Sequence, residues 1–384
     1  MERRASGEEP SGIQAVGAGP ATTEAVGAGP ATTEAGGAEP ATTAAGGAGP
    51  ATTEAVGAGP ATTAAVPRRG PKRAEGSEED CGRERNVGMS PHLPRASGET
   101  GLMTSAQVDA YLRRLGSARP EQPTSEALRE LHLRHLLTVP FENLSIHLGE
   151  EITLEEKRLL DKVTADRRGG FCYELNGAFG TLLAALGYEV ELLAGRVYDD
   201  EGRPGIPYDH LALRVRTADG DTWLADVGFG AHSHYPLAYA ERGAQDDPGG
   251  TFRVVEAGPD PAGVHGGDAP GAGDLDVVRD GTPQYRLETR TRVLGDFVAG
   301  AWWHSTSPLS HFTRSLVCSR VTDDGGRITL SGRKLKTTAP DGTREKRELE
   351  TDEEVLTVYR NCFGIELDGV PTVRNPDLSD SADS

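Results

Sequence analysis

A ten-residue repeat near the N-terminus limits where this chain can form a core. A unit of the form AVGAGPATTE recurs five times between Ala15 and Ala64, with no apolar side chain larger than an occasional valine. A segment with so little to bury cannot offset the conformational entropy lost on folding. Its period is also far shorter than that of solenoid repeats. We therefore interpret residues 1–101 as a disordered low-complexity tail.

The foldable part of the chain begins at about residue 102. Met103 stands directly before the first helical pattern, and Met89 lies a short distance upstream. This arrangement leaves two interpretations of the tail open. The tail is either a flexible linker of the mature protein, which could serve as a tether to a partner, or the product of an over-extended gene model. In the second case, translation starts at Met89 or Met103.

Charge and cysteine usage exclude several classes of function. The chain has 59 acidic and 40 basic residues and a formal net charge of −19, which disfavours binding to nucleic acid or to anionic membranes. No apolar run approaches the roughly eighteen residues that span a bilayer, and the N-terminus lacks a signal-peptide pattern, so we expect a cytoplasmic protein. No CxxC spacing indicates a zinc site or disulfide scaffold, and we expect four free thiols: Cys81, Cys172, Cys318 and Cys362.

Periodicity predicts helices first and strands afterwards. Helical patterns cover 104–116 and 124–139, and a third begins near Cys172. Strand patterns separated by turn signals follow at 189–198, 208–217, 221–229, 251–256, 285–293, 315–322 and 327–338. A last helix is predicted over 352–363, and a Gly/Pro-rich surface loop over 258–273. The chain is therefore predicted to be α+β, with parts at 102–188 (helical bundle), 189–300 (antiparallel barrel), 301–368 (α/β lid) and 369–384 (disordered acidic end).

The segment RGGFCYELN, residues 168–176, carries the strongest indication of chemistry. It places Cys172 at the start of a helix, where the helix dipole and unpaired N–H groups favour the reactive thiolate. The two preceding glycines allow a tight turn and leave room for a substrate carbonyl. A lone cysteine is more often a small buried hydrophobe, so the interpretation depends on partners elsewhere in the chain.

A predicted hairpin supplies those partners. His210 begins one strand and Asp226 ends the next, with a turn at Asp219-Gly220 between them. The hairpin would bring the two side chains close together. A carboxylate beside an imidazole fixes its tautomer, and the imidazole can then take the thiol proton. We predict a Cys172, His210, Asp226 triad, the alternative being an ordinary strand histidine and a strand-end aspartate.

Five segments together resemble the arylamine N-acetyltransferases. They lie in order between about 103 and 368: PFENL (140–144), RGGFCYELN (168–176), YDHLAL (208–213), DVGFG (226–230) and WHSTSPLSHF (303–312). The resemblance implies a helical bundle, a β-barrel and an α/β lid around a catalytic core shared with transglutaminase-like and papain-like cysteine enzymes. It also implies ping-pong chemistry. Acetyl-CoA acetylates the cysteine, and an arylamine, hydrazine or arylhydroxylamine then accepts the acetyl group, with no metal needed.

The resemblance further implies roles for individual residues. Cys172 would be the nucleophile, His210 the base and Asp226 its partner. Arg168 and Glu142 would form a buried ion pair that supports the active-site loop. The remaining implied contacts are with the cofactor at Phe229, Gly230 and Asp209, and with the acceptor at Phe141, Val197, Phe312 and Tyr173.

Two departures and two rival functions accompany the resemblance. Asp209 precedes the histidine where some bacterial relatives carry a neutral residue, and the 258–273 loop could border the cofactor cleft. An amide synthase of the same fold, which closes a polyketide macrolactam, would share the triad. A hydrolase would use water as the acceptor. A non-catalytic binding module is disfavoured because all three triad members are present. The sequence does not indicate an oligomeric state.

Overall fold

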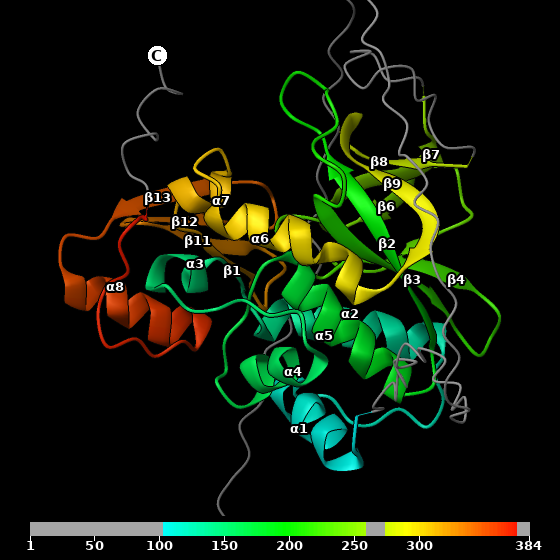
Figure 1. Cartoon of the computed structure of the whole chain (residues 1–384), viewed down its shortest axis with the longest axis horizontal. Helices are drawn as coiled ribbons and strands as arrows, with labels where there is room; N and C mark the ends of the chain where they lie inside the picture. Colours follow the sequence, from blue (N-terminus) through cyan, green and yellow to red (C-terminus); the bar gives the residue numbers. More distant parts are fainter. Residues whose placement is uncertain (1–102, 259–272, 375–384) are drawn as a thin grey trace, which may run out of the picture. The chain divides into compact units, whose positions relative to one another are not determined.

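The structure is a computed structural model that describes residues 103–258 and 273–374 (Figure 1). The predicted tail, Cys81, Met89, most of the Gly/Pro-rich loop and residues 375–384 lie outside these ranges. None of the described helices is both long enough and apolar enough to cross a membrane.

The N-terminal part is a group of five helices. Thr104 caps the first with its side chain, and Thr124 caps the second. The sequence patterns predicted three of the five and missed α3 and α4. Helix α3 has only five residues, and α4 is polar apart from Leu159, Leu160 and Val163. The bounds are α1 (Ser105–Leu115), α2 (Ser125–Thr138), α3 (Leu144–Leu148), α4 (Glu156–Thr164) and α5 (Cys172–Ala185).

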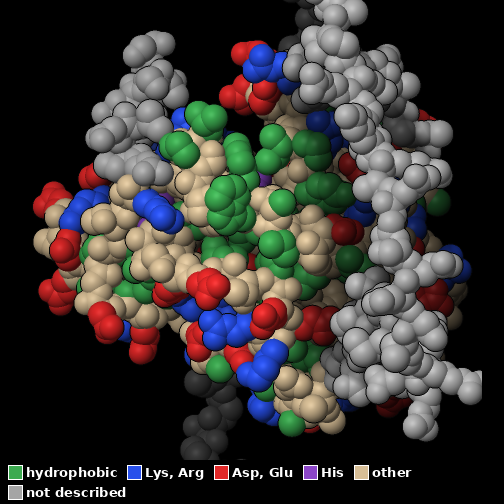
Figure 2. Space-filling view, viewed as in Figure 1, with side chains coloured by type: hydrophobic (Ala, Val, Ile, Leu, Met, Phe, Trp, Pro, Cys, Tyr) green, Lys and Arg blue, Asp and Glu red, His purple; other side chains and the backbone are tan. Residues whose placement is uncertain are grey.

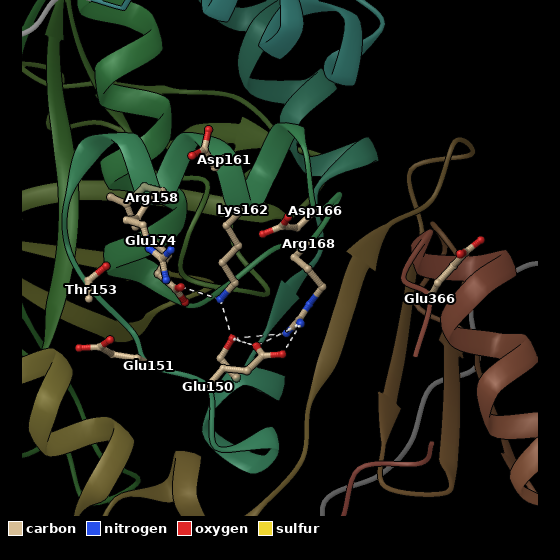
Figure 3. A pocket seen from close by; sticks show the side chains of 12 residues that line it. Glu150, Glu151, Thr153, Arg158, Asp161, Lys162, Asp166, Arg168, Glu174 and Glu366 are labelled. Carbon is tan, nitrogen blue, oxygen red and sulfur yellow. Dashed lines mark hydrogen bonds and ion pairs between the residues drawn. The ribbon is translucent and has the colours of Figure 1, made fainter. Parts of the chain in front are cut away.

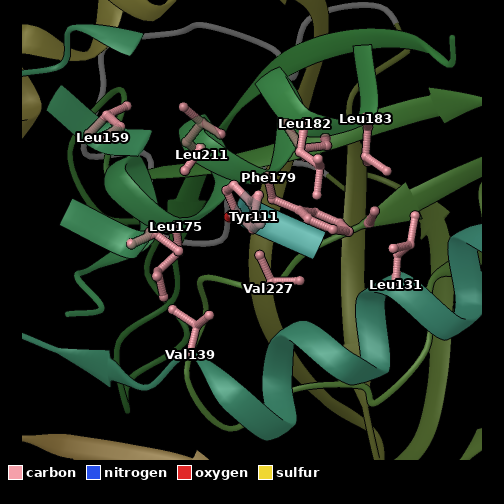
Figure 4. Packing of buried hydrophobic residues seen from close by; sticks show 14 of the residues in the cluster. Tyr111, Leu131, Val139, Leu159, Leu175, Phe179, Leu182, Leu183, Leu211 and Val227 are labelled. Carbon is pink, nitrogen blue, oxygen red and sulfur yellow. The ribbon is translucent and has the colours of Figure 1, made fainter. Parts of the chain in front are cut away.

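Helix α5 is the centre of the main hydrophobic core. Eleven of its fourteen residues are buried, so it has no polar face. Around its Phe179 ring lie Tyr111 of α1, Leu131 of α2 and Leu211 of the following sheet (Figure 4). A helix enclosed on all sides is held rigidly, because interiors are close-packed. The side chains at its N-terminus therefore have a fixed frame.

Eight antiparallel strands form the middle of the fold. Gln245 joins the two edge strands: its Oε1 accepts from the Ala238 N–H (2.7 Å), and its Nε2 donates to the Ala238 carbonyl (3.1 Å). The sheet is therefore a nearly closed barrel, as predicted. In sheet order the strands are β5 (Leu237–Ala238), β4 (Thr222–Ala225), β3 (His210–Arg216), β2 (Glu189–Val197), β9 (Thr282–Arg292), β8 (Leu275–Arg279), β7 (Gly250–Glu256) and β6 (Gln245–Asp247).

The C-terminal part is a second antiparallel sheet with helices beside it. One of its strands comes from the N-terminal part, because Phe141 and Glu142 pair with Ser319 and Cys318. The strands in sheet order are β1 (Phe141–Glu142), β10 (Cys318–Val321), β11 (Arg327–Ser331), β12 (Lys334–Thr338) and β13 (Arg344–Glu348). The helices are η1 (Leu294–Phe297), α6 (Val298–Thr306), α7 (His311–Arg314), α8 (Asp352–Val358) and the π-helical turn η2 (Tyr359–Phe363).

Two expectations for this part were wrong. The segment 327–338 is a hairpin and not one strand, since Gly332 adopts a positive φ of 56° between β11 and β12. Residues 369–374 are not disordered: Val370 and Val373 pack on the lid core, and the Arg374 N–H donates to His147 Nδ1 (3.0 Å). Single apolar residues in a polar segment gave too weak a pattern to predict this docking.

Apolar side chains gather on the outer side of α6 and its neighbours (Figure 2). Trp302 and Leu309 are 66% and 74% exposed, and Val293 and Val298 accompany them. Elsewhere on this face, acidic and basic side chains are interspersed.

Candidate active site

Cys172 is the first residue of α5 and is only 5% exposed. The loop before it is held by strand β1: the Glu142 N–H donates to the Gly170 carbonyl (2.9 Å), and Phe141 forms a bridge with Gly170. The sulfur therefore lies at the positive end of a fourteen-residue helix dipole. This is the position that the sequence predicted.

The hairpin of β3 and β4 brings His210 and Asp226 together. His210 is the first residue of β3, and Asp226 directly follows β4. The imidazole Nε2 lies 2.7 Å from Asp226 Oδ2, and both side chains are almost fully buried. Because Nε2 is engaged with the carboxylate, Nδ1 is the nitrogen left for Cys172.

The electrostatics of this pair favour an imidazolium. Burial alone would lower the pKa of His210. The charge and hydrogen bond of Asp226, together with the adjacent Cys172 side chain, outweigh burial and raise the pKa to about 10. Burial opposes ionisation of Asp226, but the His210 charge and hydrogen bond hold its pKa below the usual range. The pair thus presents a buried positive charge beside Cys172.

Asn176 is a site residue to which the sequence analysis gave no role. Its Nδ2 donates to Asp226 Oδ1 (2.8 Å) and to the Leu211 carbonyl (2.6 Å), and its Oδ1 accepts from the Val227 N–H (2.9 Å). It lies one helical turn after Cys172, which is the signal that could have revealed it. Asn176 thus links the catalytic helix to the carboxylate.

Backbone groups complete the setting of Asp226. The Gly228 N–H donates to Oδ1 (3.0 Å), and the Asp226 N–H donates to His132 Nε2 (3.2 Å). The other His132 nitrogen contacts the His234 carbonyl at 2.9 Å. Burial lowers the pKa of His132 to about 4, so its ring is neutral and Nε2 can accept.

A largely buried network of charges supports the loop before Cys172, and Figure 3 shows its members Arg168, Lys162 and Glu174. Arg168 Nε donates to Glu142 Oε1 (2.9 Å), so the structure brings the predicted ion pair together. A second pair was not predicted: Lys162 Nζ donates to Glu174 Oε1 (2.6 Å). Ser145 Oγ joins the two, since it accepts from Lys162 (2.8 Å) and from Arg168 (3.4 Å).

The residues expected to contact the acceptor divide into two groups. Phe141 and Phe312 are partly exposed, with ring centroids 6.1 Å apart, and Val197 is partly exposed at the end of β2. Tyr173 differs: it is fully buried, and its hydroxyl donates to the carbonyls of Tyr208 (2.7 Å) and Asp209 (3.1 Å). The Tyr173 side chain therefore supports the backbone at Tyr208 and Asp209, and its contact with the acceptor stays a prediction.

The residues expected to contact the cofactor also divide. The Phe229 ring lies 5.2 Å from the His210 ring, and Gly230 passes close to Phe141 with a φ of 91°. The Asp209 carboxylate makes contacts within the protein: Oδ2 accepts from the Val197 N–H (3.0 Å), and Oδ1 lies 2.8 Å from His304 Nε2. A carboxylate with both oxygens engaged by the protein is poorly placed to contact a cofactor.

A basic pocket begins directly after Gly230. Two of its arginines are close enough that burial and the Arg279 charge lower the pKa of Arg327 to about 10. Among the described residues Arg327 makes no ion pair, and it donates to Ser319 Oγ (3.1 Å). Arg279 contacts Asp280 at 3.5 Å, so of the two guanidinium groups that of Arg327 is the one without a carboxylate partner in the described part of the chain. A pocket with such a surplus of positive charge fits an anionic ligand. The basic side chains that line the pocket are Arg279, Arg327, Lys336 and Arg344.

Within residues 103–258 and 273–374, no group of three or more His, Cys, Asp and Glu side chains is arranged to hold a metal ion. His232 lines the basic pocket with His234, yet its ring is buried. Neither ring nitrogen of His232 has a hydrogen-bond partner among the described residues, and its neighbours are the rings of Phe229, Phe252 and Tyr285.

Comparison with known proteins places the chain in a family. A family model described as N-acetyltransferase matches residues 124–372. An arylamine N-acetyltransferase of Mycolicibacterium smegmatis is 35% identical over 266 residues, which is 68% of this chain and 92% of the relative. The solved structure of the M. smegmatis enzyme has a TM-score of 0.62 at 31% identity and covers 71% of this chain and 99% of its own.

A second solved structure shows a related enzyme with a ligand. It is the arylamine N-acetyltransferase of Mycobacterium marinum in complex with CoA, with a TM-score of 0.59 and 32% identity, covering 67% of this chain and 92% of its own. The helices, the nearly closed barrel and the C-terminal α/β part follow the same order in this chain. The chain therefore belongs to the arylamine N-acetyltransferase family of acyltransferases.

Proposed function

We propose that this protein transfers the acetyl group of acetyl-CoA to arylamines, hydrazines or arylhydroxylamines through a thioester on Cys172. The observation that carries the proposal is the placement of Cys172 at the start of α5, beside an imidazole that Asp226 holds at 2.7 Å. The M. marinum relative in complex with CoA supports CoA as the leaving group.

The first half-reaction forms the thioester. The Cys172 thiolate attacks the acetyl carbonyl, and the backbone N–H of Cys172 would stabilise the oxyanion. The tetrahedral adduct then breaks its bond to the CoA sulfur. The imidazolium of His210 supplies the proton that leaves with CoA. Asp226 stays ionised and keeps the imidazole in its orientation.

The second half-reaction regenerates the enzyme. The amine attacks the thioester carbonyl while neutral His210 removes its proton. Collapse of the adduct releases the amide and the Cys172 thiolate. Phe141, Val197 and Phe312 would provide an apolar surface for a flat aromatic amine.

The cofactor would approach along Phe229 and Gly230. Its phosphates would then reach the basic pocket, where Arg279 and Arg327 lack a neutralising partner beyond a 3.5 Å contact between Arg279 and Asp280. Guanidinium groups suit phosphate because they donate in a planar, bidentate geometry. We assign Asp209 no contact with the cofactor.

Intact-mass measurement after brief exposure to acetyl-CoA, with no amine present, tests the proposal. We expect one added acetyl group on the parent and none on Cys172→Ala, and we expect an arylamine to remove it as the acetylated product. An unmodified parent whose Cys172 nevertheless reacts with an alkylating reagent would overturn acetyl-CoA as the donor. It would favour a larger acyl donor, as in an amide synthase.

A further inference from the structure

Asp209 connects three parts of the proposed acceptor site. Its Oδ2 accepts from the Val197 N–H at 3.0 Å, and its Oδ1 lies 2.8 Å from His304 Nε2. The two side chains are 13% and 8% exposed. In sequence, Asp209 directly precedes His210. One carboxylate thus joins the end of β2, the start of β3 and helix α6.

His304 extends the connection from Asp209 to Phe312. Its Nδ1 lies 3.3 Å from Ser310 Oγ, which in turn accepts from the Phe312 N–H at 3.2 Å. The His304 ring also packs against the Phe312 ring, with centroids 5.3 Å apart. The chain of contacts therefore begins at Val197 and ends at Phe312, two of the residues proposed to provide the apolar surface for the acceptor.

The Asp209, His304 and Ser310 side chains repeat the composition of a hydrolytic triad, but the geometry does not support nucleophilic chemistry. Ser310 is 1% exposed, and its oxygen caps α7 by accepting the Phe312 N–H. A nucleophile must reach a substrate carbonyl, which a buried capping hydroxyl cannot. The three side chains are therefore suited to fixing the positions of the segments that they connect.

The backbone around Asp209 is held as firmly as its side chain. Tyr173 donates to the carbonyls of Tyr208 and Asp209, and Tyr208 adopts a positive φ of 61°. A non-glycine residue keeps such a conformation only where its surroundings impose it. The backbone that carries the Asp209 side chain is therefore fixed. A substitution of Asp209 should for this reason shift the positions of Val197 and Phe312.

We propose that the Asp209–His304 pair is a positioning element that sets the separation of the Val197 and Phe312 walls and thereby selects the acceptor amine. This inference rests on the proposed function of the site. Neither residue touches the reacting atoms. Removing the pair widens the acceptor pocket without removing any group that forms the thioester.

The test separates the two half-reactions. In His304→Leu and Asp209→Ala, rapid-mixing mass spectrometry measures formation of the Cys172 thioester by acetyl-CoA. Its discharge is then followed with a narrow arylamine and a bulky one. We expect the thioester to form within ~3-fold of the parent rate, while the preference between the two amines falls by ~10-fold or more. His304→Gln, which keeps an N–H donor toward Asp209, should lie closer to the parent.

A matched control is available on the same strands. Glu191 of β2 pairs with Arg214 of β3 at 2.5 Å, and neither belongs to the proposed site. Glu191→Gln should change neither half-reaction nor the amine preference. If His304→Leu slows both half-reactions equally and keeps the parent's preference, the pair is merely structural and the inference is overturned.

A second measurement separates this inference from the function on which it rests. Calorimetric titration gives the affinities of the same two amines for the free parent and for His304→Leu. A parent that forms no thioester with acetyl-CoA overturns the proposed function alone. In that case the inference is decided by the ratio of the affinities for the narrow and the bulky amine, compared between the parent and His304→Leu. A ratio that falls in His304→Leu supports it, and an unchanged ratio rejects it.

Discussion

The ammonium of Lys162 lies 2.6 Å from Oε1 of Glu174, the third residue of the helix that begins at Cys172. The other oxygen of Glu174 accepts from the Phe171 N–H at 3.3 Å. Burial and the nearby Glu142 raise the pKa of Glu174, and Lys162 opposes them. The pair fixes the first turn of the catalytic helix from a different element, α4.

Lys162→Met should destabilise the protein by ~3–5 kcal/mol, because it leaves a buried carboxylate without its cation. Urea unfolding at pH 7 measures the change. The control lies on the same helix: Lys157 pairs with Asp161 at 2.6 Å, but the side chains are 77% and 44% exposed. Lys157→Met should cost less than ~1 kcal/mol. Equal losses for the two variants would contradict the role given to the buried pair.

Asn176→Ala should impair the triad through Asp226. The substitution removes the donor at 2.8 Å from the carboxylate and leaves the Leu211 carbonyl and the Val227 N–H without partners. Each buried orphan costs ~1–3 kcal/mol of unfolding free energy. Displacement of the base by about 1 Å would slow thioester formation by ~10²-fold. Single-turnover acetylation of folded variant, verified by circular dichroism, measures the rate. A parent-like rate would exclude Asn176 from orienting Asp226.

The sequence allowed the grouping of Cys172, His210 and Asp226 to be predicted because these residues lie on strong local patterns. Cys172 follows two glycines at the start of an apolar helix, and a short turn joins the strands of His210 and Asp226. Lys162 could not be assigned, since α4 has few apolar residues and its partner lies on another helix. Pairings between distant elements depend on tertiary packing, which local periodicity does not encode.

The same dependence on tertiary packing explains why some strands were not predicted. All five residues of β13 are exposed, and its sequence REKRE carries no apolar alternation. Strand β6 consists of Gln245, Asp246 and Asp247, and the side chains of Gln245 and Asp247 bond across the barrel edge. Asp209 was expected to affect the cofactor because it stands before His210 at a position where some bacterial relatives carry a neutral residue. Its actual partner, His304, lies 95 residues away in sequence and could not be inferred.

Gly228 brings the DVGFG loop against the catalytic helix. A Cβ atom there would come 2.7 Å from the Cα of Cys172 and 2.8 Å from Asn176 Nδ2, closer than real contacts allow. Gly228→Ala should displace the loop or α5 and slow thioester formation by ~10²-fold. At Gly295 a Cβ would meet nothing within 4 Å, so Gly295→Ala should retain the parent rate. A parent-like rate in Gly228→Ala would refute the contact, and stopped-flow release of CoA measures both variants.

His232 should make stability depend on pH in the acid range. Burial lowers its pKa from 6.5 to about 4, so between these values the unfolded chain binds a proton that the folded protein does not. The free energy of unfolding therefore falls as pH drops from 6.5 to 4, by up to ~1.4 kcal/mol per pH unit from this residue.

His232→Phe fits among Phe229, Phe252 and Tyr285, and it removes two ring nitrogens that lack partners among the described residues. The variant should match or exceed the parent at pH 7 and lose stability less steeply in acid. Tyr285→Phe, in the same cage, removes no group that titrates there and should keep the parent's slope. Urea unfolding at pH 5, 6 and 7 measures all three proteins, and an unchanged slope in His232→Phe would show that this ring is not the neutral buried group.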